Sequence, residues 1–348
     1  MTTLHAPAPV PAVASLRRSV SVRVVWVITG IGVLAALAVA SVAFGVADVS
    51  AGDVVAGLTG DVSTIESAAV VKRMPRTALA ILVGAALALA GASMQAVTRN
   101  PLADPGILGV LSGAALAVVA GLAFFGIMDP YGQMGLAIVG AAAAAVFVYA
   151  VGSLGRGGAT PLKLALAGAA TSAALASLVS AILLPRIDVM STFRFWQIGG
   201  VGGAEWDRVA VVAPVLLVGA VIVFATARGM DSLALGDDLA AGLGEHVTRT
   251  RLVSSAGAVI LCGAATAIAG PIGFVGLVVP HGVRMLIGSD HRWLLPLSAI
   301  GGAALLLAAD IIGRLVAKPE EIEVGIITAL IGAPLFIWIV RRQKVREL

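Results

Sequence analysis

The chain has 348 residues, of which 59% are hydrophobic and only 12% charged, and its net charge is +4. A soluble domain has about 25% charged residues, and one globular core cannot absorb so much apolar surface, so the composition excludes a soluble enzyme. It also excludes a disordered chain, a collagen and a disulfide-stapled scaffold, because Cys262 is the single cysteine. The small net charge is interpreted as loop charge that sets topology, not as a nucleic-acid surface. The class that remains is a helical membrane protein.

Long apolar runs define the predicted elements. A membrane-spanning helix needs about 20 apolar residues, because lipid cannot satisfy free backbone polar groups. Nine runs are free of charge, and a tenth contains only His281 and Arg284 near its end. No aqueous domain fits between the runs. We therefore predict an all-α fold of ten transmembrane helices, at 24–46, 77–98, 106–128, 134–154, 164–185, 209–227, 252–270, 271–289, 293–309 and 324–340.

Residues 1–23 are rich in proline and arginine and precede the first apolar run. A signal peptide is one interpretation, but the run is long and no clear small-residue cleavage pattern follows it, so we expect a retained first span. An even number of spans puts both termini on one side, and a cytoplasmic placement leaves most Lys and Arg residues inside. This predicts a multi-pass protein of the cell membrane, with a single ten-helix domain at 24–342 between cytoplasmic tails at 1–23 and 343–348.

Residues that carry chemistry are sparse in this sequence. It has no GxxxxGK[ST] phosphate loop, and its four histidines lack metal-ligand spacing, so we expect no ATP hydrolysis, no catalytic residues, no cofactor and no metal site. Asp310 is the one carboxylate interpreted as lying within the spans, and Arg314 follows four residues later, which favours a helix-surface ion pair. An ion-coupled secondary transporter would need paired intramembrane charges, and a membrane-embedded enzyme would need a polar cluster, so both are weaker alternatives.

The loop after the second run reads RNPLADPGILGV over residues 99–110. Its turn-forming residues predict a short non-helical link in which Asp104 caps the next helix and Pro105 lies in its first turn. The string resembles the signature of the FecCD-type family, the permease subunits of ABC importers for iron-siderophores, haem and vitamin B12. Further matches follow in family order over roughly residues 20–342: KRMPR (72–76), LALAGAATS (164–172), FWQIGGVGGAEWDRV (195–209), LALGDDLAAGLG (233–244), AGPIGFVGLVVPHGVRMLIGSDHRWLLP (269–296), AADIIGR (308–314) and GIITALIGAPLFIWIVRR (325–342).

The resemblance implies a function and a set of partners. The expected function is translocation of a ferric siderophore, the commonest cargo of the family, with haem or vitamin B12 as alternatives. The implied partners are a second permease subunit, identical or paralogous, two ATP-binding subunits and an extracytoplasmic substrate-binding protein, all in or on the lipid bilayer. Because such a cargo arrives already chelated, we expect a neutral path, and the Ala, Gly, Ser and Thr residues of 164–180 suit it.

Residues 228–251 form the longest cytoplasmic stretch between the predicted spans. Their leucines predict a short amphipathic helix within about 231–244, ended by its last glycine. An exposed apolar face here needs a protein partner or the membrane interface, and the residues alone leave both open. The resemblance implies the coupling helix that contacts the ATP-binding subunit, with the residues Leu235, Gly236, Leu239, Ala240, Leu243 and Gly244.

Arg73, Arg76 and Arg314 lie on the predicted outer side, against the prevailing bias of positive charge. From the residues alone they are incidental loop charges or lipid-headgroup contacts. The resemblance implies that they pair with acidic residues of the substrate-binding protein, where charge pairs give orientation and association rate more than affinity.

Two short segments on the predicted cytoplasmic side precede the third and fifth spans. The resemblance implies that they close the inner mouth of the path, whereas a plain helix-turn contact is the alternative. The predicted gate residues are Asn100, Leu102 and Thr160.

Residues 86–95 and 265–274 have weakly similar sequences, ALALAGASMQ and ATAIAGPIGF. They fall in the second and seventh predicted spans, which an odd offset of five spans places in opposite directions. The pair suggests an inverted repeat that relates spans two to five with spans seven to ten, as the resemblance also implies.

Overall fold

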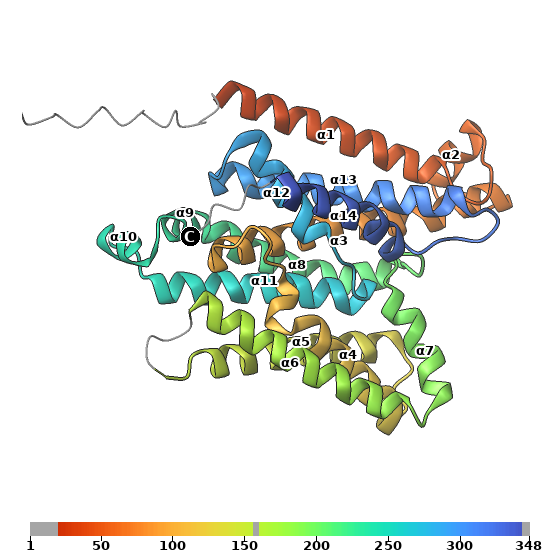
Figure 1. Ribbon diagram of the computed structural model, residues 1–348. Coiled ribbons are helices and arrows are strands. Elements are labelled where there is room, and N and C mark those ends of the chain that lie inside the picture. Colours follow the sequence, from red (N-terminus) through yellow and green to blue (C-terminus); the bar gives the residue numbers. More distant parts are fainter. Residues whose placement is uncertain (1–19, 156–159, 343–348) are drawn as a thin grey trace, which may run out of the picture.

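The computed structural model describes residues 20–155 and 160–342, and every regular element in those ranges is a helix (Figure 1). The elements are, in chain order, α1 (Val20–Ala43), α2 (Ala51–Leu58), α3 (Ile65–Thr98), η1 (Pro105–Leu108), α4 (Val110–Ala120), η2 (Gly121–Phe125), α5 (Pro130–Gly152), α6 (Pro161–Leu183), α7 (Ile187–Ile198), α8 (Trp206–Ala225), α9 (Ala227–Leu233), α10 (Asp237–Gly242), α11 (Val247–Ala269), α12 (Val275–Ile287), α13 (His291–Val316) and α14 (Val324–Arg342). The predicted all-α fold class is therefore confirmed for the described residues.

Seven of the described helices are long and apolar enough to cross a membrane: α1, α3, α5, α6, α8, α11 and α13. Three further helices are apolar but shorter, at Val110–Phe125, Val275–Ile287 and Val324–Ile337. Each of the ten predicted runs overlaps one of these ten elements. The predicted bounds are less accurate: residues 270–274 precede α12 without helical structure, because Gly270 and Phe274 have positive φ angles.

Helix α3 starts twelve residues before the predicted span. Thr64 caps it, accepting a hydrogen bond from the backbone N–H of Ser67, so the polar residues after Thr64 continue the helix. At 34 residues it is about 50 Å long, well beyond the roughly 30 Å of a bilayer's hydrocarbon core. The extra turns carry Arg73 and Arg76 out of the apolar span on a rigid element.

Helix α3 forms the centre of the bundle, and 78% of its most apolar window is buried. It packs against α8, α11, α12 and α13. Glycines permit the closest approaches: a Cβ on Gly91 would overlap the carbonyl oxygen of Gly276 in α12, and a Cβ on Gly84 would overlap that of Gly302 in α13. Without a hydrophobic driving force between helices in lipid, such close backbone packing is what holds them together.

The helix contacts repeat between two halves of the chain. Helix α3 packs on α13, and α11 packs on α5; likewise α4 packs on α5, and α12 on α13. Helix α5 then contacts α6, as α13 contacts α14. Each of these contacts has a counterpart when α3, α4, α5 and α6 are exchanged with α11, α12, α13 and α14 respectively.

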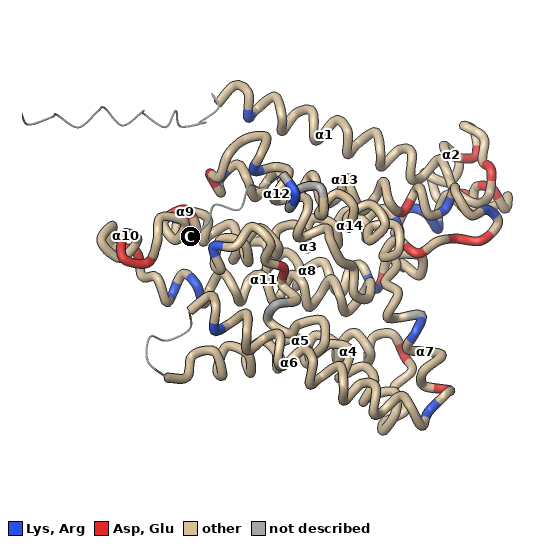
Figure 2. The backbone as a smooth tube through the Cα atoms, viewed as in Figure 1, with Lys and Arg blue, Asp and Glu red and all other residues tan. Residues whose placement is uncertain are grey.

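Most acidic and basic residues gather at two opposite ends of the bundle (Figure 2). One end carries α9 and α10, and the other carries α2 and the loop between α13 and α14 (Figure 1). Helix α1 runs between these ends on the outside, with only 6% of its apolar window buried. At the α10 end, Arg23 forms an ion pair of 2.8 Å with Asp290, which caps α13.

Candidate functional site

The three arginines predicted to dock a partner lie together at the α2 end. Arg76 of α3 binds Asp310 of α13 through Nε at 3.0 Å and Nη2 at 2.8 Å, and its Nη1 lies 2.6 Å from Glu321 Oε2. Arg314 Nη2 lies 3.0 Å from the other carboxylate oxygen of Asp310. The arginines are buried, with 7%, 9% and 2% exposure for Arg73, Arg76 and Arg314.

The same cluster ends helix α1. Arg73 donates to the carbonyls of Val42, Ala43 and Ala47, the last at 2.6 Å, and Arg314 donates to those of Ser41 and Phe44 at 2.9 and 3.0 Å. The last carbonyls of a helix have no partner within it and carry the negative end of its dipole. The guanidinium groups therefore bind the end of α1 to α3 and α13.

The sequence interpretation of Asp310 and Arg314 needs a correction. Their predicted ion pair is present, but it is not on the helix surface: the two side chains are 1% and 2% exposed. The carboxylate is shared with Arg76, which is 234 residues away along the chain and could not be identified from local spacing. The docking role of the three arginines stays a prediction, and their side chains in this structure contact the chain itself.

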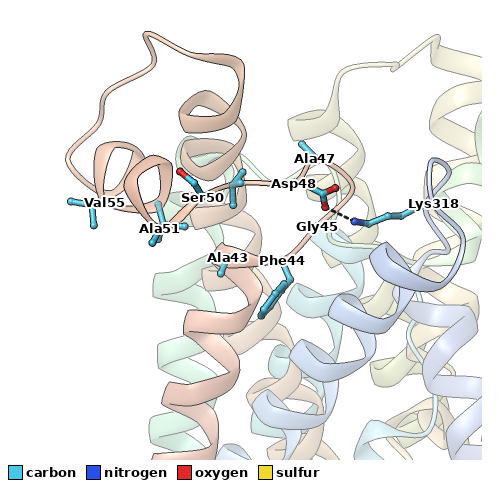
Figure 3. Close-up of a pocket in the computed structure, with 11 residues that line it drawn as sticks. Ala43, Phe44, Gly45, Ala47, Asp48, Ser50, Ala51, Val55 and Lys318 are labelled. Atoms are coloured by element: carbon cyan, nitrogen blue, oxygen red, sulfur yellow. Dashed lines mark hydrogen bonds and ion pairs between the residues drawn. The ribbon is translucent and has the colours of Figure 1, made fainter.

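A surface cavity of about 510 Å³ lies beside this cluster (Figure 3). The link from α1 to α2 forms most of its wall, with Phe44, Ser50 and Val55 labelled in the view, and Lys318 closes one side. Lys318 Nζ donates to Asp48 at 2.9 Å, and this hydrogen bond lowers the pKa of the Asp48 carboxyl. The Asp48 side chain is 96% exposed, so this pair is accessible from outside, unlike the arginine cluster.

A second cavity, of about 420 Å³, lies between the starts of α5 and α8 and the end of α11. Its wall combines apolar residues with Gln133, Arg208 and Glu323. Burial raises the pKa of the Glu323 carboxyl. Trp196 of α7 also lines it and has a buried indole N–H without a partner among the described residues.

The predicted coupling helix is shorter than the range 231–244. Helix α10 covers Asp237–Gly242, between Gly236 and Gly244, while residues up to Leu233 belong to the separate helix α9. Gly236, with a φ of +107°, allows the sharp turn between the two helices. The expected apolar surface is present: Leu235, Leu239 and Leu243 are 56%, 63% and 69% exposed, and Ala240 faces inward. An exposed apolar face of this kind suits a protein partner or the membrane interface.

Helix α10 is joined to the bundle by ion pairs that were not predicted from the sequence. Asp237, its first residue, lies 3.0 Å from Arg99 at the end of α3 and 3.0 Å from Arg251 in α11. Arg99 has a left-handed backbone with a φ of 51°, which turns the chain after α3. The exposed leucines of α10 are therefore connected to the central helix α3 through the Asp237–Arg99 ion pair. The spacing of acidic and basic residues gave no signal for these long-range pairs.

The predicted gate residues form local turns. Asn100 Oδ1 accepts a hydrogen bond from the backbone N–H of Leu102 at 2.9 Å, and the predicted cap of η1 by Asp104 is present. Thr160 caps α6 by accepting from the N–H of Lys163 at 3.4 Å. Both segments lie at the α10 end of the bundle (Figure 1). These hydrogen bonds are local to each turn and do not join Thr160 to the other two, so the gate stays a prediction.

Comparison with known proteins identifies similar chains. A model of the FecCD transport family matches residues 33–342. The ferric enterobactin transport system permease protein FepD of Escherichia coli (strain K12) is 47% identical over 272 residues, 78% of this chain and 81% of that protein. The hemin transport system permease protein HmuU of Yersinia pestis is 41% identical over 277 residues, 78% of this chain and 82% of that protein. A solved metal-chelate type ABC transporter in an inward-facing conformation superposes with a TM-score of 0.80 at 29% identity, covering 92% of this chain and 99% of that one.

Proposed function

This chain belongs to the FecCD transport family and is a permease subunit of an ABC importer, and we propose that its cargo is a ferric siderophore delivered by a substrate-binding protein. Transport is driven by ATP hydrolysis on separate subunits, and this chain supplies the membrane path. The observation that carries the cargo proposal is the extent of the match to a ferric enterobactin permease, which covers most of both chains. Relatives named for hemin and cobalamin make those chelates the alternatives.

The proposed membrane arrangement has ten spans, with both termini in the cytoplasm and an inverted repeat of spans two to five and seven to ten. Three shorter apolar helices beside the seven long ones support the count. The paired contacts of α3 with α13 and α11 with α5 support the repeat, because an internal two-fold axis exchanges those pairs. Most charged residues lie at the two ends of the bundle, which supports a bilayer position between those ends, because charges are costly within lipid.

The partners are proposed to bind at opposite ends. The exposed leucines of α10 suit the ATP-binding subunit. The end that carries Arg73, Arg76 and Arg314 suits the substrate-binding protein; because these guanidiniums are buried, we propose that they act there with the exposed charges around them, such as Lys318.

A second permease subunit would complete the path. Helix α6 is exposed for most of its length, and its outward side combines leucines with small residues that include Ala170, Ala173 and Ser177. Such a face is neutral and carries no metal ligand, which suits a chelate that must pass without being held. We place this face of α6 toward the partner permease and the path.

Uptake by whole cells tests the cargo. A strain that lacks this chain is supplied with radiolabelled ferric siderophore, haem or cobalamin, and then complemented with the chain. We expect complementation to restore ferric-siderophore uptake and not the other two. If only haem or cobalamin uptake is restored, that chelate is the cargo and the siderophore proposal is wrong. The assignment as a permease subunit would not change.

A further inference from the structure

A basic cavity beneath the α9–α10 segment has no role in the translocation described above. Its volume is about 210 Å³, and its wall comes from the ends of α3, α9 and α12 and the start of α13. The residues around it include two arginines and two buried polar side chains: Arg99, Arg284, Gln95 and His291. Elements that lie far apart in the sequence thus bring these groups to one place at the α10 end.

Among the described residues, no carboxylate lines this cavity. Arg99 forms its ion pair with Asp237, which lies outside the cavity wall. Arg284 is half-buried, and the described residues provide no ion pair for it. Two guanidinium groups on a wall without a carboxylate favour an anion as the occupant of the cavity.

Two side-chain atoms on the same wall lack hydrogen-bond partners. His291 is 2% exposed, and its Nδ1 lies 2.6 Å from Asp231 on α9, which is outside the cavity wall. The opposite ring atom, Nε2, is buried without a partner among the described residues, as is Oε1 of Gln95. Buried polar atoms of this kind are rare unless water or a ligand completes them. Gln95 Nε2 already donates to the carbonyls of Gly276 and Leu277, so its Oε1 requires a donor.

We propose that this cavity binds a phosphate group that also carries a hydroxyl. Phosphate oxygens accept from the two arginines, for which guanidinium geometry is well suited. A hydroxyl, on a lipid headgroup or on hydrogen phosphate itself, donates to Gln95. The occupant would join α3, α12 and α13 beside the α9–α10 segment. Binding depends on the cavity alone, so the proposal stands or falls independently of the siderophore assignment.

Thermal unfolding of the purified importer complex measures occupancy. One arm adds inorganic phosphate, with chloride at equal ionic strength as the reference. The other arm reconstitutes the complex in nanodiscs of phosphatidylglycerol or of phosphatidylcholine. We expect a rise in Tm that grows with ligand concentration, because a ligand that binds only the folded state stabilises it. A rise with phosphate indicates the free anion, and a rise only with phosphatidylglycerol indicates the lipid headgroup.

The variants assign the effect to the cavity. Arg284→Gln should abolish the rise in Tm, whereas Arg292→Gln, an exposed arginine outside the cavity wall, should retain it. If Arg284→Gln does not fold, Arg99→Gln removes the other guanidinium from a more exposed position and should weaken binding at least tenfold. No rise in either arm, or equal rises in Arg284→Gln and the unmodified complex, would overturn the proposal.

Discussion

At the residue scale, Asp310 is the central side chain of the α2 end of the bundle. It is 1% exposed and contacts two guanidiniums from different helices. Of these two, Arg314 also binds the end of α1, through the carbonyls of Ser41 and Phe44. A buried charge cluster adds little net stability when it is complete, but loss of one member leaves the others unpaired in a low-dielectric site.

Asp310→Asn removes this shared charge with almost no change of shape. We expect a destabilisation of about 3–5 kcal/mol, because Arg76 and Arg314 lose their common partner. The measurement is thermal unfolding of the purified protein in detergent. Asp48→Asn is the matched control, since its pair with Lys318 is exposed to solvent and should contribute little to stability. Equal unfolding temperatures for the two variants would contradict the role given to Asp310.

At the element scale, α10 combines an exposed apolar face with ion pairs to the bundle. The face offers Leu239 and Leu243, four residues apart, to a partner. Asp237 joins the same short helix to Arg99 and Arg251. One element therefore carries both a docking surface and a connection to α3, which allows the two properties to be separated by mutation.

The first prediction for α10 concerns docking. Leu239→Asp with Leu243→Asp should release the ATP-binding subunit, because burying each leucine is worth about 1.5–3 kcal/mol. The variant should still insert and bind the substrate-binding protein. Co-purification measures retention of the ATPase, with Leu58→Asp at the opposite end as the control. Full retention together with normal import would show that the ATPase docks elsewhere.

The second prediction for α10 concerns coupling. Asp237→Asn should leave the ATPase bound but lower the transport per ATP hydrolysed by several-fold, because α10 loses its ion pairs to α3 and α11. Its effect on stability should stay below about 1 kcal/mol, since the Asp237 side chain is 41% exposed. Parallel assays of ATP hydrolysis and uptake in proteoliposomes give the ratio. The neighbouring Asp238→Asn, which keeps both ion pairs, should leave that ratio unchanged.

At the scale of the whole molecule, the bundle depends on close contacts of α3 with helices from the other half of the chain. Gly84 meets Gly302, and Gly91 meets Gly276, with no space for a Cβ. Helix α1, in contrast, is largely exposed; it packs on α13 along one side, and arginines bind it at both ends. The core is therefore sensitive to added volume, and the periphery is sensitive to lost charge.

Gly91→Ala tests this difference. An added methyl group would push α3 away from α12, so we expect a destabilisation of about 1–3 kcal/mol and a lower yield of folded protein. Gly135→Ala in α5 is the control, because a methyl group added there would have no other atom within 4 Å. Size-exclusion profiles and unfolding temperatures compare the two. A Gly91→Ala protein as stable as the control would show that the two helices can separate without cost.

The sequence by itself determined the membrane class, the approximate position of each apolar helix and the family, because hydropathy and short motifs are local properties. The sequence also located α10 and its exposed leucines, because Gly236 and Gly244 flank this short helix. Only the tertiary structure decided that Arg73, Arg76 and Arg314 are buried and that Asp310 has two arginine partners, since Arg76 and Asp310 meet across 234 residues. The basic cavity likewise exists only where the ends of α3, α9 and α12 converge with the start of α13. Long-range charge pairing leaves no local pattern in a sequence, whereas a helix that spans lipid appears as a continuous apolar run.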